Sequence, residues 1–194
     1  MTDPLRALLA DPGLRRVTGA LAAGGARAWV VGGAVRDALL GKPGGDVDLA
    51  TDALPPRVAE LAEAAGLRTV PTGIDHGTVT VLSGGRPFEV TTLRRDVETD
   101  GRHAVVAFGT SLPEDAARRD FTMSALYLAP DGALLDPVGG LPDLRAGRVR
   151  FVGEAARRMG EHLLGRGECT NYDLDTPGLP VPPKAPIDRS PVPF

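Results

Sequence analysis

The stretch from residue 28 to residue 51 reads AWVVGGAVRDALLGKPGGDVDLAT, and it decides the fold. Its first four residues, Ala28–Val31, are apolar and typical of a buried strand. Two glycines then turn the chain into a predicted helix over Ala34–Gly41, which ends at a glycine before Pro43. A second short strand is predicted at Asp46–Ala50. Two strands joined through a helix in so short a span predict a chain of alternating strands and helices.

The second of these strands carries two acids at alternate positions, Asp46 and Asp48. Because successive side chains of a strand point to opposite faces, both carboxylates leave one face while Val47 and Leu49 enter the core. Two like charges this close repel each other unless a cation or a basic group lies between them. A solvated strand end after a turn shows the same spacing, so the pair alone leaves both interpretations open.

A third acid, Glu89, lies in a predicted hairpin. Residues 76–85, HGTVTVLSGG, and residues 86–93, RPFEVTTL, alternate in polarity and turn at Gly84–Gly85. Glu89 points away from the core that Phe88 and Val90 enter. Three carboxylates from two strands would supply oxygen ligands for Mg²⁺, which keeps open positions for substrate phosphates. An edge-strand acid facing water is the alternative interpretation of Glu89.

Basic and glycine-rich segments suit an anionic substrate. The strand–Gly–Gly–helix turn before Arg36 presents free backbone N–H groups to a ligand, although it matches neither the dinucleotide-binding nor the P-loop spacing. Residues 117–127, ARRDFTMSALY, follow a helix that a Ser111–Glu114 capping box opens. Arginines there suit phosphate or base contacts, Asp120 can cap the next turn, and Phe121 offers a packing or stacking face. An exposed arginine pair beside a buried aromatic is the simpler alternative.

The amino-acid composition excludes several classes of protein. The chain has 194 residues, a formal net charge of −3 and 42% hydrophobic residues, which excludes wholesale disorder and argues against a generic nucleic-acid coat. No apolar run approaches a membrane span, and the first residues lack the basic start and apolar stretch of a signal peptide. A single cysteine, Cys169, gives no disulfide framework and no disulfide-linked partner. We therefore expect a cytoplasmic protein without a membrane partner.

Proline marks the expected domain boundary. Seven of the 18 prolines fall between Asn171 and Phe194, in a segment without helical or alternating period. We expect a compact α/β (α+β) domain over residues 1–165, with a mixed sheet flanked by helices and a last helix from Glu154 to about Leu164. Residues 166–194 are expected to form a disordered tail.

Together these segments resemble one family in order and spacing, from about Leu21 to Arg158. It is the family of class II tRNA nucleotidyltransferases (CCA-adding enzymes) and bacterial poly(A) polymerases, whose catalytic head has a DNA polymerase β-like fold. The continuation DPVGGLPDLRAGRVRFVGEAARRM, residues 136–159, follows the family's pattern from the head into the neck, at about 140–165. The motifs that carry the resemblance are VVGGAVRD, GGDVDLAT, HGTVTV, FEVTTLRRD and RRDFTMSALY.

The resemblance implies a role for each candidate residue. Asp46 and Asp48 match the metal-binding pair, and Glu89 matches the third active-site carboxylate. Gly33, Arg36 and Arg119 match positions that bind the incoming nucleotide, and residues 96–105 fall where the family has a flexible loop. Family members use Mg²⁺ to transfer CMP or AMP from CTP or ATP to the 3′ hydroxyl of a tRNA or another RNA, releasing pyrophosphate.

The chain departs from the family after residue 159. Where the family has an EDxxRxxR helix that reads the nucleotide base, Glu161 keeps the first acid. His162 replaces the Asp, Gly165 the first Arg and Glu168 the second. The family's neck, body and tail domains do not follow in these residues.

Three further functions stay open beside CCA addition. A poly(A) polymerase-like enzyme shares the same head, and a non-catalytic remnant that binds nucleotide or RNA would fit the changed helix. A hydrolase with a histidine metal site is less consistent with the sequence, because His76, His103 and His162 lie in separate segments without ligand spacing.

Overall fold

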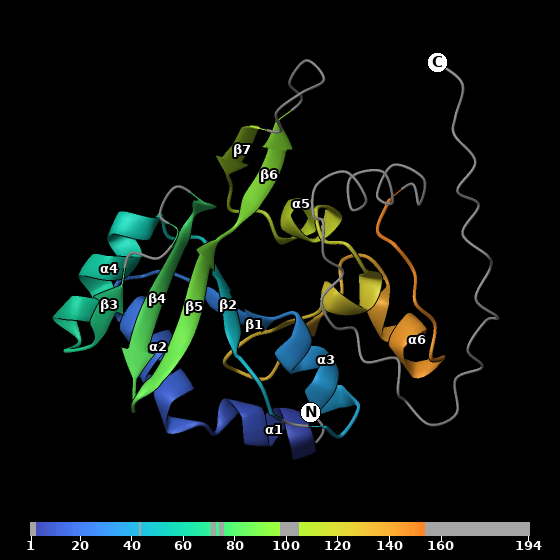
Figure 1. The fold of residues 1–194 in the computed structure, drawn as a ribbon, viewed down its shortest axis with the longest axis horizontal. Coiled ribbons are helices and arrows are strands. Elements are labelled where there is room, and N and C mark those ends of the chain that lie inside the picture. The colour runs from blue at the N-terminus through green and yellow to red at the C-terminus, as the bar shows by residue number, and fades with distance from the viewer. Residues whose placement is uncertain (1–2, 43, 71–72, 74–75, 98–104, 154–194) are drawn as a thin grey trace, which may run out of the picture.

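A mixed sheet organises the part of the chain that the computed structural model describes, residues 3–42, 44–70, 73, 76–97 and 105–153 (Figure 1). The helices are α1 (Asp3–Leu9), α2 (Pro12–Ala23), α3 (Gly33–Leu39), α4 (Pro55–Ala64), α5 (Leu112–Ala117) and α6 (Gly140–Arg145), with a 3₁₀ turn, η2, at Thr122–Ser124. The strands are β1 (Ala28–Val31), β2 (Asp48–Thr51), β3 (Arg68–Val70), β4 (Thr78–Ser83), β5 (Arg86–Thr92), β6 (Arg94–Val97), β7 (Val105–Phe108), β8 (Tyr127–Leu128) and β9 (Leu134–Leu135).

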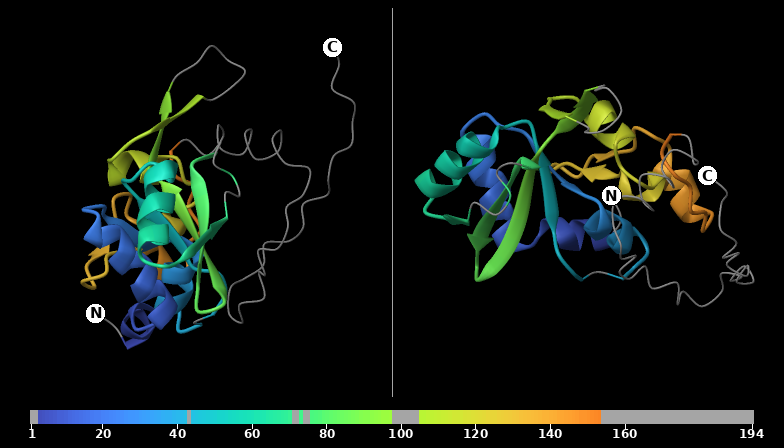
Figure 2. Two further views of the ribbon diagram at one scale, coloured as in Figure 1. Left: turned by 90° about the vertical axis from the view of Figure 1, so that its left-hand side faces the viewer. Right: turned by 45° about the horizontal axis from the view of Figure 1, so that its top comes forward.

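The main sheet has the strand order β3-β4-β5-β2-β1-β8-β9. β2 and β5 run parallel to each other, and the other neighbouring pairs are antiparallel. β6 and β7 pair only with each other and project from the main sheet as an arm (Figures 1 and 2). The expected mixed sheet flanked by helices is confirmed.

The predicted local elements are largely those observed. The AWVV strand coincides with β1, and the predicted hairpin is β4–β5, turning at Gly84–Gly85. The strand predicted at Asp46–Ala50 is displaced, since β2 begins at Asp48. β1 is the reason: its last residue, Val31, pairs with Asp48, and the chain then turns away. Asp46 therefore precedes the strand instead of belonging to it.

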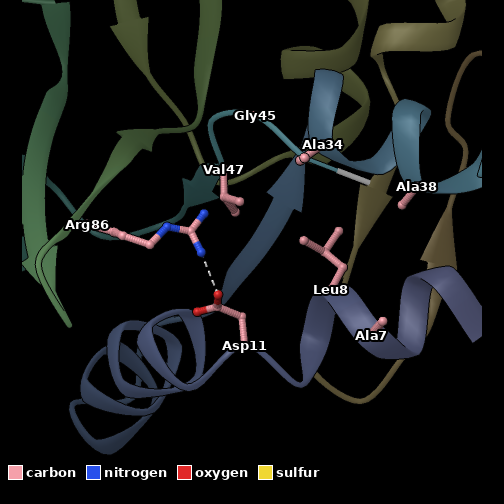
Figure 3. Close-up of a pocket in the computed structure, with 9 residues that line it drawn as sticks. Ala7, Leu8, Asp11, Ala34, Ala38, Gly45, Val47 and Arg86 are labelled. Carbon is pink, nitrogen blue, oxygen red and sulfur yellow. Dashed lines mark hydrogen bonds and ion pairs between the residues drawn. The ribbon is translucent and has the colours of Figure 1, made fainter. Parts of the chain in front are cut away.

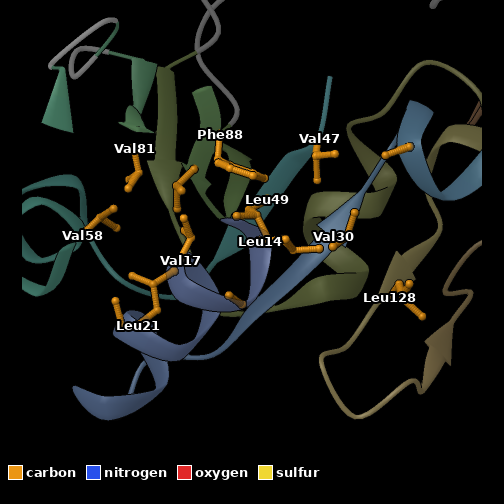
Figure 4. Close-up of a cluster of buried hydrophobic side chains, with 14 of the residues drawn as sticks. Leu14, Val17, Leu21, Val30, Val47, Leu49, Val58, Val81, Phe88 and Leu128 are labelled. Atoms are coloured by element: carbon orange, nitrogen blue, oxygen red, sulfur yellow. The ribbon is translucent and has the colours of Figure 1, made fainter. Parts of the chain in front are cut away.

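One main core lies between the sheet and the helices on one of its faces. Leu14, Val17 and Leu21 recur on one side of α2 and point toward Phe88 of β5 and Val58 of α4 (Figure 4). This spacing is that of an amphipathic helix, whose apolar side must be covered. A smaller cluster, which includes Trp29 and Tyr127, covers part of the opposite face.

The segment after α6 returns to the RRDFT stretch and fixes it. The Thr122 N–H donates to the Arg150 carbonyl at 2.9 Å, and the Val152 N–H donates to the Asp120 carbonyl at 3.0 Å. Asp143 of α6 accepts both the Thr122 hydroxyl, at 2.7 Å, and the Arg150 Nε, at 2.7 Å. The expected capping role of Asp120 is wrong, because η2 begins after Phe121 without a side-chain cap.

Some expectations fall outside the described residues: the helix from Glu154, the boundary near residue 165, and the tail over 166–194. They stay predictions. No helix in the described part of the chain is both long enough and apolar enough to cross a membrane.

Two glycines in helices give a paired test of this packing. A Cβ on Gly140 would collide with the Thr122 carbonyl, whereas a Cβ on Gly19 of α2 would meet no atom within 4 Å. We expect Gly140→Ala to lower the free energy of unfolding by about 1–3 kcal/mol. Gly19→Ala should raise it by about 0.5–1 kcal/mol, because alanine favours helix. Urea unfolding of both variants measures the two effects, and a destabilised Gly19→Ala or a neutral Gly140→Ala would contradict this packing.

Candidate active site

The candidate site is built on one transverse row of residues across the sheet. Tyr127 of β8 pairs with Val31 of β1, Val31 with Asp48 of β2, Asp48 with Glu89 of β5, and Glu89 with Thr80 of β4. Paired residues of neighbouring strands project to the same face. The row therefore places two of the three predicted carboxylates side by side, with a tyrosine two strands away.

The sheet register brings Asp48 and Glu89 together although 41 positions separate them in sequence. Both side chains are exposed, while the flanking Leu49, Phe88 and Val90 are fully buried. The protein packed around Asp48 raises the pKa of its carboxyl, and the charges of Glu89 and then Asp46 raise it further. The charge of Arg119 acts in the opposite direction. Asp46 lies in the segment before β2, and its charge still acts on Asp48.

This donor set fits a hard cation held together with a substrate. In the described part of the chain, no group of three or more His, Cys, Asp or Glu side chains is arranged to hold a metal ion by itself. Mg²⁺ is commonly bound by one or two carboxylates plus substrate phosphates, so a complete protein cage is not required. After burial, the charges of Glu89 and Asp46 are the next causes of the raised pKa of Asp48, and a cation would relieve their repulsion.

A glycine turn lies between two guanidinium groups near these acids. Gly32 joins β1 to α3 with a φ of +76°, a conformation that side chains other than glycine rarely adopt. The Arg119 Nη1 lies 3.9 Å from where a Cβ on Gly32 would be. The Arg36 Nη2 lies 3.7 Å from the corresponding place on Gly33. Two cations thus flank consecutive backbone positions, as binding of a phosphate chain would require.

The two arginines are held in different ways. Arg36 donates its Nε to Asp37 at 2.8 Å, and both side chains are partly exposed. Arg119 donates its Nε to the Tyr127 hydroxyl at 3.0 Å and its Nη2 to Asp115 at 3.0 Å. Burial would lower the pKa of Arg119, but Tyr127 and Asp115 outweigh it, so that the pKa is raised and the charge is retained.

Sequence reasoning missed Asp115 and Tyr127. Asp115 precedes Arg119 by four positions, which is the spacing of an ion pair on one helix face and could have indicated it. Tyr127 gives no such signal, because only the β1–β8 pairing brings its hydroxyl to Arg119. Phe121 packs on Phe151, with ring centroids 4.8 Å apart, as the packing interpretation expected. His76 is exposed, and His103 and His162 lie outside the described residues.

A separate pocket of about 270 Å³ lies between α1, α3 and the segment before β2 (Figure 3). Arg86 and Asp11 form a 2.7 Å ion pair at its edge. Val47 points into it, and Val47 alternates with Asp46 and Asp48 along the chain. The pocket is therefore on the side of the sheet opposite the carboxylates.

Residues 28–150 match the model of the Poly A polymerase head domain, so the chain belongs to this family. It is 45% identical over 153 residues to CCA tRNA nucleotidyltransferase 1, mitochondrial, of Mus musculus, covering 78% of this chain and 35% of that protein.

Solved structures show the same likeness. The crystal structure of the Bacillus stearothermophilus CCA-adding enzyme in complex with CTP matches with a TM-score of 0.69 and 41% identity, over 84% of this chain and 37% of that one. A tRNA nucleotidyltransferase complexed with a primer tRNA and an incoming ATP analog matches with a TM-score of 0.57 and 36% identity, over 71% and 39%. The chain thus spans little more than a third of these relatives.

The coupling of Asp48 to Glu89 can be tested directly. We expect Glu89→Gln to lower the pKa of Asp48 toward its ordinary value, because the substitution removes a neighbouring negative charge. An NMR titration of the Asp48 side-chain carboxyl carbon measures this shift. Glu60→Gln, at an exposed position of α4, is the matched control and should leave the titration unchanged. An Asp48 titration that Glu89→Gln does not move would contradict the observed register.

Proposed function

We propose that this chain is a catalytic head that transfers CMP and AMP from CTP and ATP to the 3′ hydroxyl of a tRNA or another RNA. One observation carries the proposal: the Asp48–Glu89 pair shares a site with a glycine turn that Arg36 and Arg119 flank. Acids for a cation and arginines for phosphates are the two needs of nucleotidyl transfer. The family membership of residues 28–150 supports the same reaction class.

Asp46 and Asp48 would hold Mg²⁺, with Glu89 as the third carboxylate of the site. When bound, the ion would neutralise phosphate charge and assist attack by the RNA hydroxyl. Arg36 and Arg119 bind the triphosphate and fix its direction along the Gly32–Gly33 turn. Gly33 leaves room there that a side chain would fill. We place this reaction in the cytoplasm, where a chain with one cysteine needs no disulfide.

Two other functions remain as alternatives. A poly(A) polymerase-like enzyme would use this head in the same way and would differ in the nucleotides it adds. A non-catalytic remnant would bind nucleotide or RNA without transfer, and the departures at His162, Gly165 and Glu168 favour it. The product of the reaction separates these alternatives.

The carboxylates are tested by isosteric substitution. With Mg²⁺, CTP, ATP and a tRNA that ends just before CCA, we expect Asp48→Asn to reduce nucleotide transfer at least about a thousandfold, or ~4 kcal/mol of transition-state stabilisation. Asp131→Asn, in an exposed turn, is the matched control and should retain the parent rate. Equal activity of parent and Asp48→Asn would contradict the proposed site, and a parent that binds nucleotide without transfer would favour the remnant.

Arg36, at the glycine turn, should contact the phosphates of the nucleotide and not its base. We expect Arg36→Ala to weaken CTP and ATP binding by the same factor, roughly ten- to a hundredfold, because charge-assisted hydrogen bonds to phosphate carry no base identity. Calorimetric titration with each nucleotide measures this, with Arg57→Ala on the exposed side of α4 as the control. An unequal loss for the two nucleotides would place Arg36 at the base instead.

We expect this chain to add nucleotides to RNA without the correct C-C-A order. Base choice needs buried polar groups aimed at the base edge, and His162, Gly165 and Glu168 do not supply an Asp–Arg pair. These positions lie outside the described residues, so the prediction rests on sequence. Sequencing the RNA products should show slow addition without CCA order, or no addition. Faithful CCA ends formed at an ordinary enzymatic rate would contradict it.

A further inference from the structure

We propose that Tyr127 and Asp115 are positioning residues that hold the Arg119 guanidinium beside the Gly32 turn and Asp48. The inference rests on the proposed function, because it assigns these residues to the phosphate end of the same site. Both residues hydrogen-bond Arg119, whose Nη1 lies 3.9 Å from where a Cβ on Gly32 would be.

The hydrogen bonds of this cluster have a fixed direction. The Tyr127 hydroxyl donates to Asp115 Oδ2 at 2.8 Å and accepts the Arg119 Nε at 3.0 Å. A carboxylate can only accept, so the hydroxyl proton points to Asp115 and an oxygen lone pair faces the guanidinium. Burial raises the pKa of Tyr127, with Asp115 acting in the same direction and Arg119 against it, so the hydroxyl keeps its proton at neutral pH. Polarised in this way, each bond strengthens the next.

The cluster holds two nitrogen atoms of the Arg119 guanidinium and leaves the third nitrogen facing the site. The Arg119 Nε is hydrogen-bonded to Tyr127 and its Nη2 to Asp115, while its Nη1 lies nearest the Gly32 turn. Tyr127 is fully buried and Asp115 is 5% exposed, while the arginine side chain keeps 27% of its surface open. A guanidinium fixed at one edge presents its other edge without losing further rotamer freedom on binding.

Asp115 also joins this cluster to the base of the β6–β7 arm. Its Oδ1 accepts the backbone N–H of Arg94, the first residue of β6, at 3.1 Å. The same carboxylate thus sets the start of the arm and the direction of Arg119.

A second cluster of the chain supplies a matched comparison. The Thr122 hydroxyl donates to the buried Asp143 at 2.7 Å, and Arg150 donates to the same carboxylate at 2.7 Å. Thr122→Val and Tyr127→Phe therefore each delete one hydroxyl that donates to a buried aspartate. Only Tyr127→Phe also removes the hydrogen-bond acceptor of an arginine beside the candidate site, the Arg119 Nε. The two variants should lose similar stability and differ in ligand binding.

The test uses the 194-residue chain and two measurements. The first follows the Arg119 Nε–H resonance by ¹⁵N NMR: we expect it to be protected from exchange in the parent and in Thr122→Val, and lost in Tyr127→Phe. The second measures the affinity of the Mg²⁺ complexes of CTP, ATP and inorganic tripolyphosphate by calorimetry. Tyr127→Phe should weaken all three about tenfold, as loss of an aligned charge-assisted hydrogen bond predicts. Thr122→Val should stay within about twofold.

A double-mutant cycle separates positioning from a general loss of structure. In an Arg119→Ala background, Tyr127→Phe should change these affinities by less than about twofold, because the group that it positions is gone. An equal loss in both backgrounds, or no loss in a parent that binds, would overturn the inference. If the parent binds none of the three ligands, the proposed function fails, and the Nε–H resonance alone decides: retention in Tyr127→Phe overturns the positioning role, and its loss supports it.

Discussion

Parallel pairing of β2 with β5 places two carboxylates, Asp48 and Glu89, next to each other on an exposed face of the sheet. The strands are held in this register by residues on the opposite face, where Leu49, Phe88 and Val90 are fully buried. Moving either strand by one residue would bring its acid into the core and its apolar residues into water. The hydrophobic packing thus enforces a repulsion that the acids alone would avoid.

The raised pKa of Asp48, caused by burial and then by the neighbouring acids, has a consequence for stability. Because the pKa of Asp48 is raised in the folded chain, the folded state binds a proton more readily than the unfolded state does. The metal-free fold therefore loses stability as the pH rises from the ordinary aspartate pKa through the raised one. A divalent cation beside Asp48 would offset the part of that penalty that the charges of Glu89 and Asp46 cause.

The glycine turn and its arginines depend on the same framework. β1 lies next to β2, so the turn that follows Val31 begins beside Asp48. β8 lies on the other side of β1, and it brings Tyr127 to the position from which it holds Arg119. Neighbouring strands thus place the acids, the glycine turn and the Arg119 guanidinium close to one another. The pocket beside α1 and α3 contributes nothing to it, since it lies on the reverse side of the sheet.

Local patterns in the sequence predicted β1, the β4–β5 hairpin and the alternating face of Glu89, because each depends on residues close along the chain. They misplaced the start of β2, because that depends on where its partner β1 stops. The candidate acids and arginines carried recognisable motifs. Tyr127 ends one of these motifs, but the motif gives no sign of its contact with Arg119, which arises from the pairing of β8 with β1. What sequence missed was therefore set by contacts between strands that are distant in the chain.

The proposed function requires that Asp46, Asp48 and Glu89 form a divalent-cation site. Paramagnetic broadening by Mn²⁺, a mimic of Mg²⁺, tests it most directly in a ¹⁵N-labelled chain. We expect substoichiometric Mn²⁺ to broaden the amide resonances of Asp48 and Glu89 first, and more strongly with CTP present. Asp48→Asn should abolish this selectivity. Broadening centred on other acids, such as Asp143, or spread evenly over the surface would contradict it.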